Sequence, residues 1–194
     1  SMALFLSGTR LSLIKKGFAC ASIDLNAYPD LRSFAGAMTS MATKALESNT
    51  DRLIKIFSSF HRLRPKLSMD ADGNVSARLE LAADDKEALT ALIEGLAHAE
   101  VLAAKKKITL VIIIDEFSDI DKYDGRTVEK ALRSEIQKHN HVGYIFSGSE
   151  QSVMLSMIRD PKRAFYKLGR IMELGPIKRQ GYTIFIQNWL RKGG

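Results

Sequence analysis

The chain has 194 residues, 45% of them apolar, and a net charge of +7. This length and composition are those of one ordinary globular domain with a sizeable core. The longest apolar run, LVIII, is far short of a membrane span, and the N-terminus lacks a signal-peptide pattern. Cys20 is the single cysteine, which excludes an internal disulfide and a cysteine metal cluster, so a cytoplasmic location is expected. The positive charge permits an acidic partner without requiring one.

Short apolar segments alternate with helical periodicity along the chain. The segment ITLVIIID is an almost unbroken β-branched run, which is typical of a central parallel strand buried on both faces. The predicted strands are 3–7, 18–25, 108–115, 142–147 and 171–174. The predicted helices are 31–60, 84–104, 124–139, 151–158 and 177–192.

This alternation predicts an α/β fold with three αβα layers around a central, mostly parallel five-stranded sheet. One stretch, KLSMDADGNVSARLELA, interrupts the alternation. It has turn residues at Asp72-Gly73-Asn74 and an alternating apolar pattern after them, which predicts a β-hairpin inserted at about 66–82.

The strongest functional pattern is ITLVIIIDEFSDID, in which Asp115 and Glu116 directly follow the apolar strand. Ligands of open α/β sheets bind beyond the carboxyl ends of the strands. A carboxylate there can hold Mg²⁺ through water, and a second one can orient or deprotonate a water that attacks a phosphate. The alternative is a strand that ends in an ordinary polar turn.

The next apolar strand, in VGYIFSGSE, ends at Ser147. Because the carboxyl ends of parallel strands meet at one edge of the sheet, Ser147 is expected beside Asp115 and Glu116. Its hydroxyl could then hydrogen-bond the attacking water or a phosphate. The alternative is that SGS is simply a turn.

Together with the segment DPKRAFYKLGRIMELGPI, these patterns resemble the AAA+ ATPases of the P-loop class, and more closely their archaeal-type branch found in prokaryotes. The resemblance extends from Leu4 to about Leu190. It implies ATP and Mg²⁺ as ligands, with Asp115 coordinating Mg²⁺ through water, Glu116 as catalytic base and Ser147 as polar sensor. It also offers Arg170 or Arg163 as an arginine finger, which would stabilise charge on the transferring phosphoryl group. The alternative for each arginine is a solvated loop charge.

The phosphate loop of that family is incomplete here. Gly8, Thr9 and Arg10 resemble the beginning of a nucleotide-binding loop, but the expected Gly-Lys-Ser/Thr is absent. Only ten residues, Gly8 to Gly17, separate the first two predicted strands, which is too short for a phosphate loop and a crossover helix. Three explanations stay open: a segment is missing between Arg10 and Leu11, the loop has been lost, or residues 3–7 do not form a strand.

The resemblance divides the chain into a core at 1–176 and the start of a helical lid at 177–194, as in a core fragment of a larger ATPase. The first hypothesis is an ATP-binding and ATP-hydrolysing domain that couples nucleotide state to conformational change, in an oligomer or with a nucleic-acid or protein partner. The alternative is a non-catalytic interaction module that lacks a working nucleotide loop. Binding of nucleic acid through the net charge alone ranks last because no motif supports it.

Overall fold

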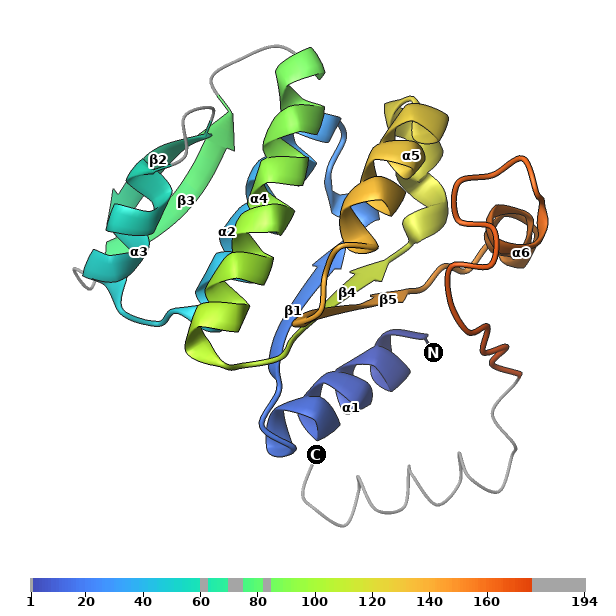
Figure 1. Cartoon of the computed structure of the whole chain (residues 1–194), viewed down its shortest axis with the longest axis horizontal. Coiled ribbons are helices and arrows are strands. Elements are labelled where there is room, and N and C mark those ends of the chain that lie inside the picture. Colours follow the sequence, from blue (N-terminus) through green and yellow to red (C-terminus); the bar gives the residue numbers. More distant parts are fainter. Residues whose placement is uncertain (1, 60–62, 70–74, 82–84, 176–194) are drawn as a thin grey trace.

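A three-stranded parallel sheet lies at the centre of the protein (Figure 1). The computed structural model describes residues 2–59, 63–69, 75–81 and 85–175. The sheet has the strand order β1-β4-β5, with Ala19 paired to Leu110 and Leu110 to Val142. The strands are β1 (Ala19–Asp24), β4 (Leu110–Asp115) and β5 (Val142–Phe146).

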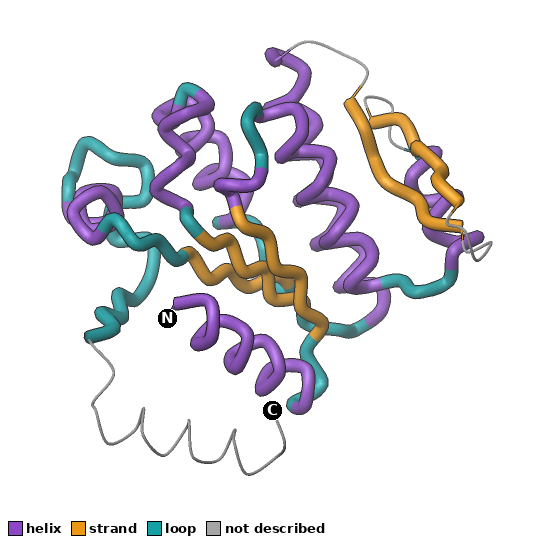
Figure 2. The backbone as a smooth tube through the Cα atoms, turned by 180° about the vertical axis from the view of Figure 1, so that it is seen from behind, coloured by secondary structure: helices purple, strands orange, loops and turns teal. Residues whose placement is uncertain are grey.

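Helices cover both faces of this sheet, as Figures 1 and 2 show. The helix α1 lies on one face, and the helices α2, α4 and α5 lie on the other. Two short 3-10 helices follow β1 and β4, and α6 follows β5. The helices are α1 (Met2–Lys15), η1 (Leu25–Ala27), α2 (Leu31–Leu46), α3 (Thr50–Ser58), α4 (Asp85–Lys106), η2 (Phe117–Tyr123), α5 (Gly125–Ile136) and α6 (Gln151–Arg159).

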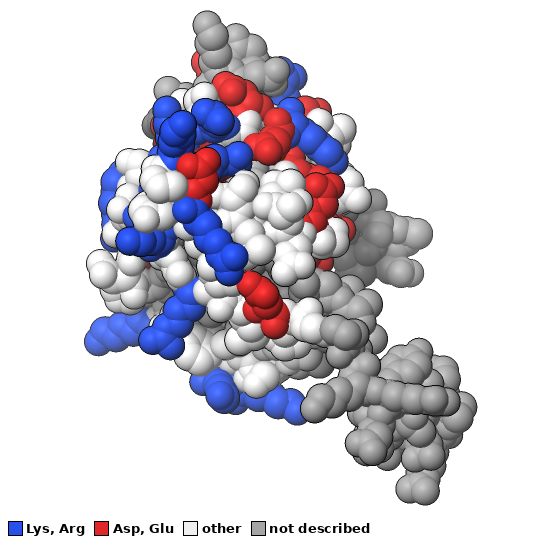
Figure 3. All heavy atoms as spheres, turned by 90° about the vertical axis from the view of Figure 1, so that its right-hand side faces the viewer, with Lys and Arg blue, Asp and Glu red and all other residues white. Residues whose placement is uncertain are grey.

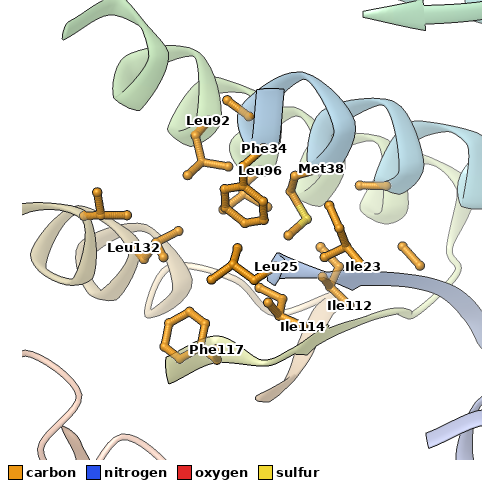
Figure 4. Close-up of a cluster of buried hydrophobic side chains, with 14 of the residues drawn as sticks. Ile23, Leu25, Phe34, Met38, Leu92, Leu96, Ile112, Ile114, Phe117 and Leu132 are labelled. Atoms are coloured by element: carbon orange, nitrogen blue, oxygen red, sulfur yellow. The ribbon is translucent and has the colours of Figure 1, made fainter. Parts of the chain in front are cut away.

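The alternation of side chains along each strand divides the core into two parts. On the α2 and α4 face, Ile112 and Ile114 of β4 pack with Phe34 and Leu92, all of them buried (Figure 4). On the α1 face, Ile113 packs in a smaller cluster that also contains Leu6, Cys20 and Val111. The prediction of a strand buried on both faces is therefore confirmed for β4.

The predicted hairpin is confirmed as a two-stranded antiparallel sheet, β2 (Leu63–Met69) with β3 (Val75–Leu81). Its turn falls outside the described residues. The helical pattern predicted over 31–60 is two helices instead of one. The break follows Leu46, and the side chain of Asn49 caps the second helix by accepting a hydrogen bond from the Arg52 N–H at 3.0 Å.

The prediction of a five-stranded sheet is wrong, because two of the five segments form no strand in this structure. Residues 171–174 have no regular structure, and the side chains of Ile171, Met172 and Leu174 are exposed. Residues 3–7 lie within α1. The fold is therefore an α/β arrangement around three parallel strands, with the antiparallel hairpin beside it.

The first predicted strand is helical because its apolar residues continue at helical spacing beyond the short window that looked like a strand. Leu6 and Leu13, seven residues apart, both pack towards the sheet. The helix ends at Lys15 and is followed by a turn at Gly17, whose φ of +86° suits glycine, and the Phe18 N–H donates back to the Leu13 carbonyl. The ten-residue spacing therefore reflects a wrongly assigned strand, the third of the open explanations.

The proposed boundary between a core and a lid lies outside the described residues, as does the predicted helix at 177–192. Within the described part of the chain, no helix is long and apolar enough to cross a membrane.

Candidate functional site

Asp115 and Ser147 meet at the carboxyl edge of the sheet, where β4 and β5 end. The Ser147 hydroxyl donates a hydrogen bond of 2.7 Å to Oδ1 of Asp115, and the Glu116 N–H donates to the same oxygen at 3.0 Å. Both strands are parallel, so their ends lie side by side. The expectation that Ser147 lies beside the acidic pair is confirmed, whereas the chemical roles of these residues stay predictions.

Glu116 has a left-handed backbone, with φ 50° and ψ 42°. This conformation costs a residue other than glycine about 1–2 kcal/mol. The turn directs the Glu116 carboxylate towards the loop after β5, where Oε2 accepts hydrogen bonds from the Ser149 N–H at 3.1 Å and the Ser149 hydroxyl at 2.9 Å. The strained residue therefore turns the Glu116 carboxylate towards Ser149, which binds it.

Backbone hydrogen bonds hold the two loops together beyond the ends of the strands. The Ser147 N–H donates to the Ile114 carbonyl at 2.9 Å, and the Phe117 N–H donates to the Ser147 carbonyl at 2.8 Å. Beneath this ladder, the ring centroid of Phe117 lies 4.5 Å from that of Phe146 and 5.3 Å from that of Phe165. We call the site formed by Asp115, Glu116 and Ser147 the acidic edge. It lies next to these packed aromatic rings, which support the turn after β4.

Two residues of this edge were not predicted. Asp24 ends β1 and is the register partner of Asp115, and Ser149 holds Glu116. Asp24 could have been found by the same signal as Asp115, because it is a carboxylate at the end of a strand. Its Oδ1 caps the following turn by accepting from the Asn26 N–H at 2.9 Å. No sequence signal distinguishes Ser149 from other loop serines.

The residues proposed for the phosphate loop lie elsewhere. Gly8, Thr9 and Arg10 are part of the continuous helix α1, and the Thr9 hydroxyl donates to the Phe5 carbonyl at 2.9 Å. A helix interior directs its N–H groups to its own carbonyls, so these residues cannot cradle a phosphate with their backbone. A shallow hollow of about 410 Å³ lies on α1, lined by Phe5, Gly8, Thr9, Ser12, Leu13 and Lys16. Its lining includes none of the acidic-edge residues.

The two candidate arginines differ in their surroundings. Arg163 has a side chain only 12% exposed and forms an ion pair with the buried Glu129 and a second one, at 3.3 Å, with Asp121. The hydrogen bond to Glu129 raises the pKa of Arg163. This pairing occupies the guanidinium within its own chain, as expected of a structural residue.

Arg170 is exposed in the loop that follows α6, together with Lys162 and Lys167. Figure 3 shows the face of the molecule on this side, where Lys and Arg side chains gather. The structure therefore leaves Arg170 as a solvated loop residue and does not bring it to Asp115.

The donor set at the acidic edge suits a hydrated Mg²⁺ better than a fully enclosed metal. It consists of oxygen atoms from carboxylates and hydroxyls, the ligand type that Mg²⁺ prefers, and Mg²⁺ is usually held by one or two carboxylates with several waters. Among the described residues there is no group of three or more His, Cys, Asp or Glu side chains that could hold a metal. A metal bound here would therefore keep most of its water shell.

Comparison with protein-family models and with curated proteins gives no match for this sequence. Function is therefore inferred from the geometry of the acidic edge and from the motifs of the sequence.

Proposed function

We propose that this chain is a nucleotide-binding domain of the ATPase type, and that Asp115, supported by Ser147, holds hydrated Mg²⁺ of a bound Mg·ATP. One observation carries the proposal. The Asp115 carboxylate and the Ser147 hydroxyl are joined at 2.7 Å on adjacent parallel strands, at the edge where α/β sheets bind ligands. In such a site the cation, when bound, neutralises charge on the phosphates.

The chain's own side chains would act in distinct ways. Ser147 fixes the orientation of Asp115 by donating to Oδ1, which leaves Oδ2 free to accept from a metal-bound water. Glu116 would orient or deprotonate the attacking water only after it leaves Ser149, because its Oε2 already accepts two hydrogen bonds there. We therefore expect this form of the chain to bind Mg·ATP weakly and to turn it over slowly.

A second candidate is a non-catalytic interaction module. The observation that favours it is the helical conformation of Gly8, Thr9 and Arg10, since no described residues form a phosphate-binding loop after a strand. In this case Asp115 and Glu116 would be retained without catalytic use.

A binding experiment separates the two candidates. A fluorescent ATP analogue is titrated with and without Mg²⁺ into the unaltered chain, into Asp115→Asn and into Asp51→Asn. Asp51 is an exposed aspartate on α3 and gives a matched control for the loss of one charge. The proposal expects binding that requires Mg²⁺, that weakens at least about tenfold in Asp115→Asn, a loss of about 1.4 kcal/mol, and that is unchanged in Asp51→Asn.

Two outcomes would contradict this proposal. Equal binding by the unaltered chain and Asp115→Asn would exclude Asp115 as the metal-holding residue. No binding of the analogue by any form, in samples whose circular dichroism confirms folding, would favour the interaction module. Broadening of NMR signals near Asp115 and Ser147 by Mn²⁺ tests the metal site without reference to ATP.

A further inference from the structure

A histidine with a buried side chain follows α5 and precedes β5, at the end of the sheet opposite the acidic edge. The His139 side chain is 1% exposed, and its two ring nitrogens contact two different elements. Nδ1 lies 2.8 Å from the Tyr144 hydroxyl on β5, and Nε2 lies 3.3 Å from Oε1 of Glu135 on α5. These three side chains therefore form a chain of hydrogen bonds that joins α5 to the central sheet.

The Glu135 carboxylate determines where His139 carries its first proton. Carboxylate oxygens only accept hydrogen bonds, so Nε2 of His139 must carry a proton that it donates. At Nδ1 two arrangements are then possible. A neutral imidazole accepts a hydrogen bond from the Tyr144 hydroxyl, whereas an imidazolium donates one to it. A second proton on His139 therefore reverses the hydrogen bond to Tyr144 and leaves the one to Glu135 in place.

Tyr144 favours the neutral form of His139. Burial, together with the charges of Glu135 and Glu100, raises the pKa of Tyr144, so its hydroxyl keeps its proton. Within the described residues, His139 is the one hydrogen-bond partner of this hydroxyl. If an imidazolium donates to the Tyr144 oxygen, the hydroxyl proton loses its acceptor, and a polar group left unpaired away from water costs free energy. Protonation of His139 thus breaks the match between the two side chains.

Two carboxylates near His139 attract a second proton, but both already have donors. Lys138 donates to Glu135 at 2.7 Å, and Glu100 on α4 accepts from two backbone N–H groups and binds the His141 ring. Their attraction for an imidazolium is therefore reduced. The titratable and charged groups around His139 are Glu135 and Lys138 on α5, Glu100 on α4, His141 before β5 and Tyr144 on β5.

We propose that His139 is a proton switch between α5 and β5, in which the neutral imidazole holds Tyr144 and protonation releases it. Mild acid is the signal, because histidine is the side chain whose charge ordinarily changes between pH 5 and pH 8. The Tyr144 ring lies 5.8 Å from the His139 ring and 6.0 Å from the Phe146 ring, centroid to centroid. Release of Tyr144 therefore loosens the aromatic packing along β5. The switch does not depend on nucleotide binding.

Nitrogen-15 NMR of the imidazole rings tests the arrangement. At pH 7.5 we expect His139 to carry one proton, on Nε2, with Nδ1 as an acceptor. On acidification, the ring signals of Tyr144 should shift together with the Nδ1 signal of His139. The proposal is overturned if Nδ1 carries a proton at pH 7.5, or if the Tyr144 signals do not follow the protonation of His139.

The variant His139→Gln tests the effect on stability. A glutamine amide can donate to Glu135 and accept from Tyr144, as the neutral imidazole does, but it does not titrate. The folded chain holds His139 neutral, whereas the unfolded chain protonates it below about pH 6.5, so its contribution to stability is full above that pH and falls below it. At pH 5.5 the unfolded chain favours the proton about tenfold. We expect His139→Gln to reduce the fall in melting temperature between pH 7.5 and pH 5.5 by about 3–5 °C.

The control is His141→Gln, which removes a half-exposed imidazole bound to Glu100. It should not reduce the fall, because a protonated His141 beside this carboxylate favours the folded chain. Burial lowers the pKa of His98, so His98 adds the same fall to all three proteins. The proposal is overturned if the melting temperature of His139→Gln falls as steeply as that of the unaltered chain, or if His141→Gln reduces the fall equally.

Discussion

Arg163 joins the loop after α6 to α5 through a nearly buried ion pair. The Glu129 side chain is 1% exposed, and Nε of Arg163 donates to Oε2 of Glu129 at 3.1 Å, while Nη2 bonds the other carboxylate oxygen. The planar guanidinium thus contacts both oxygens, which a lysine cannot reproduce. This pair stabilises the folded state mainly because Arg163 compensates the charge of the Glu129 carboxylate, which water cannot reach.

We expect Arg163→Ala to destabilise the protein by about 3–5 kcal/mol, because it leaves the Glu129 carboxylate buried and unpaired. Chemical denaturation, followed by circular dichroism, measures this loss. The double variant Arg163→Met with Glu129→Leu, which removes both charges, should recover most of it. Arg170→Ala is the control, since this exposed residue should change stability by less than about 0.5 kcal/mol. If Arg163→Ala leaves the stability unchanged, the structural role of Arg163 is excluded.

At the scale of secondary-structure elements, the contact between α2 and α4 depends on the absence of a side chain at Gly95. A Cβ added there would lie 2.0 Å from Oγ1, 2.8 Å from Cγ2 and 2.9 Å from Cβ of Thr39. Thr39 is fully buried, and its hydroxyl has no hydrogen-bond partner within the described residues. The two helices therefore approach each other through one small and one stiff, β-branched residue.

We expect Gly95→Ala to destabilise the protein by about 1–3 kcal/mol, although alanine is the better helix former, because the overpacked contact must separate. Gly8→Ala on α1 is the matched control. Its added Cβ meets no atom of the described residues within 4 Å, so the substitution should stabilise the helix by about 0.5–1 kcal/mol. Thermal unfolding compares the two variants. A destabilising Gly8→Ala would contradict a helical conformation at this position, and Thr39→Ala should partly rescue Gly95→Ala.

At the scale of the whole molecule, the sequence predicted the structure correctly where the residue types of a segment favoured one kind of secondary structure. The run at 110–114 is almost entirely β-branched, which favours a strand buried on both sides, and the carboxylate that follows it marked the edge where Ser147 also lies. The strand predicted at residues 3–7 was wrong because a five-residue apolar window fits a strand or a helix. The helix forms because it allows Leu6 and Leu13 to pack on the sheet together. Residues 171–174 misled for a different reason, since this short apolar segment has no regular structure and its large apolar side chains are exposed.

Ion pairs and hydrogen bonds of two glutamates connect distant elements, and they make the whole fold sensitive to acid. Glu47 follows α2 and accepts from Lys106, at the end of α4, at 2.7 Å. Glu100 on α4 accepts from the backbone N–H groups of Asn140 and His141, both at 3.0 Å for Oε1, just before β5. These carboxylates therefore join α2 to α4, and α4 to the central sheet.

Both glutamates have lowered pKa values in the folded protein. The hydrogen bond from Lys106 lowers the pKa of Glu47, and the Asn49 N–H adds to this effect. Burial raises the pKa of Glu100, but the hydrogen bonds from the His141 side chain and from the backbone of Asn140 and His141 outweigh it. A carboxylate with a lowered folded pKa stabilises the fold fully above its unfolded pKa, about 4.3 for glutamate, and loses that contribution as the pH falls through the folded value.

We therefore expect these two glutamates to contribute a nearly constant stabilisation between pH 7 and pH 5. Below about pH 4.3 this stabilisation is lost, and the melting temperature should fall steeply. Glu100→Gln should lower the melting temperature at pH 7, since it removes a charged acceptor of three N–H groups, and should flatten the fall below pH 4.3. Glu150→Gln, at an exposed position whose side chain makes no cap bond to α6, should leave both parts of the profile unchanged. Melting followed by circular dichroism from pH 7 to pH 3 measures the profiles. If the melting temperature falls equally steeply below pH 4.3 in Glu100→Gln and in the unaltered chain, acid acts elsewhere than on the Glu100 link between α4 and the segment before β5.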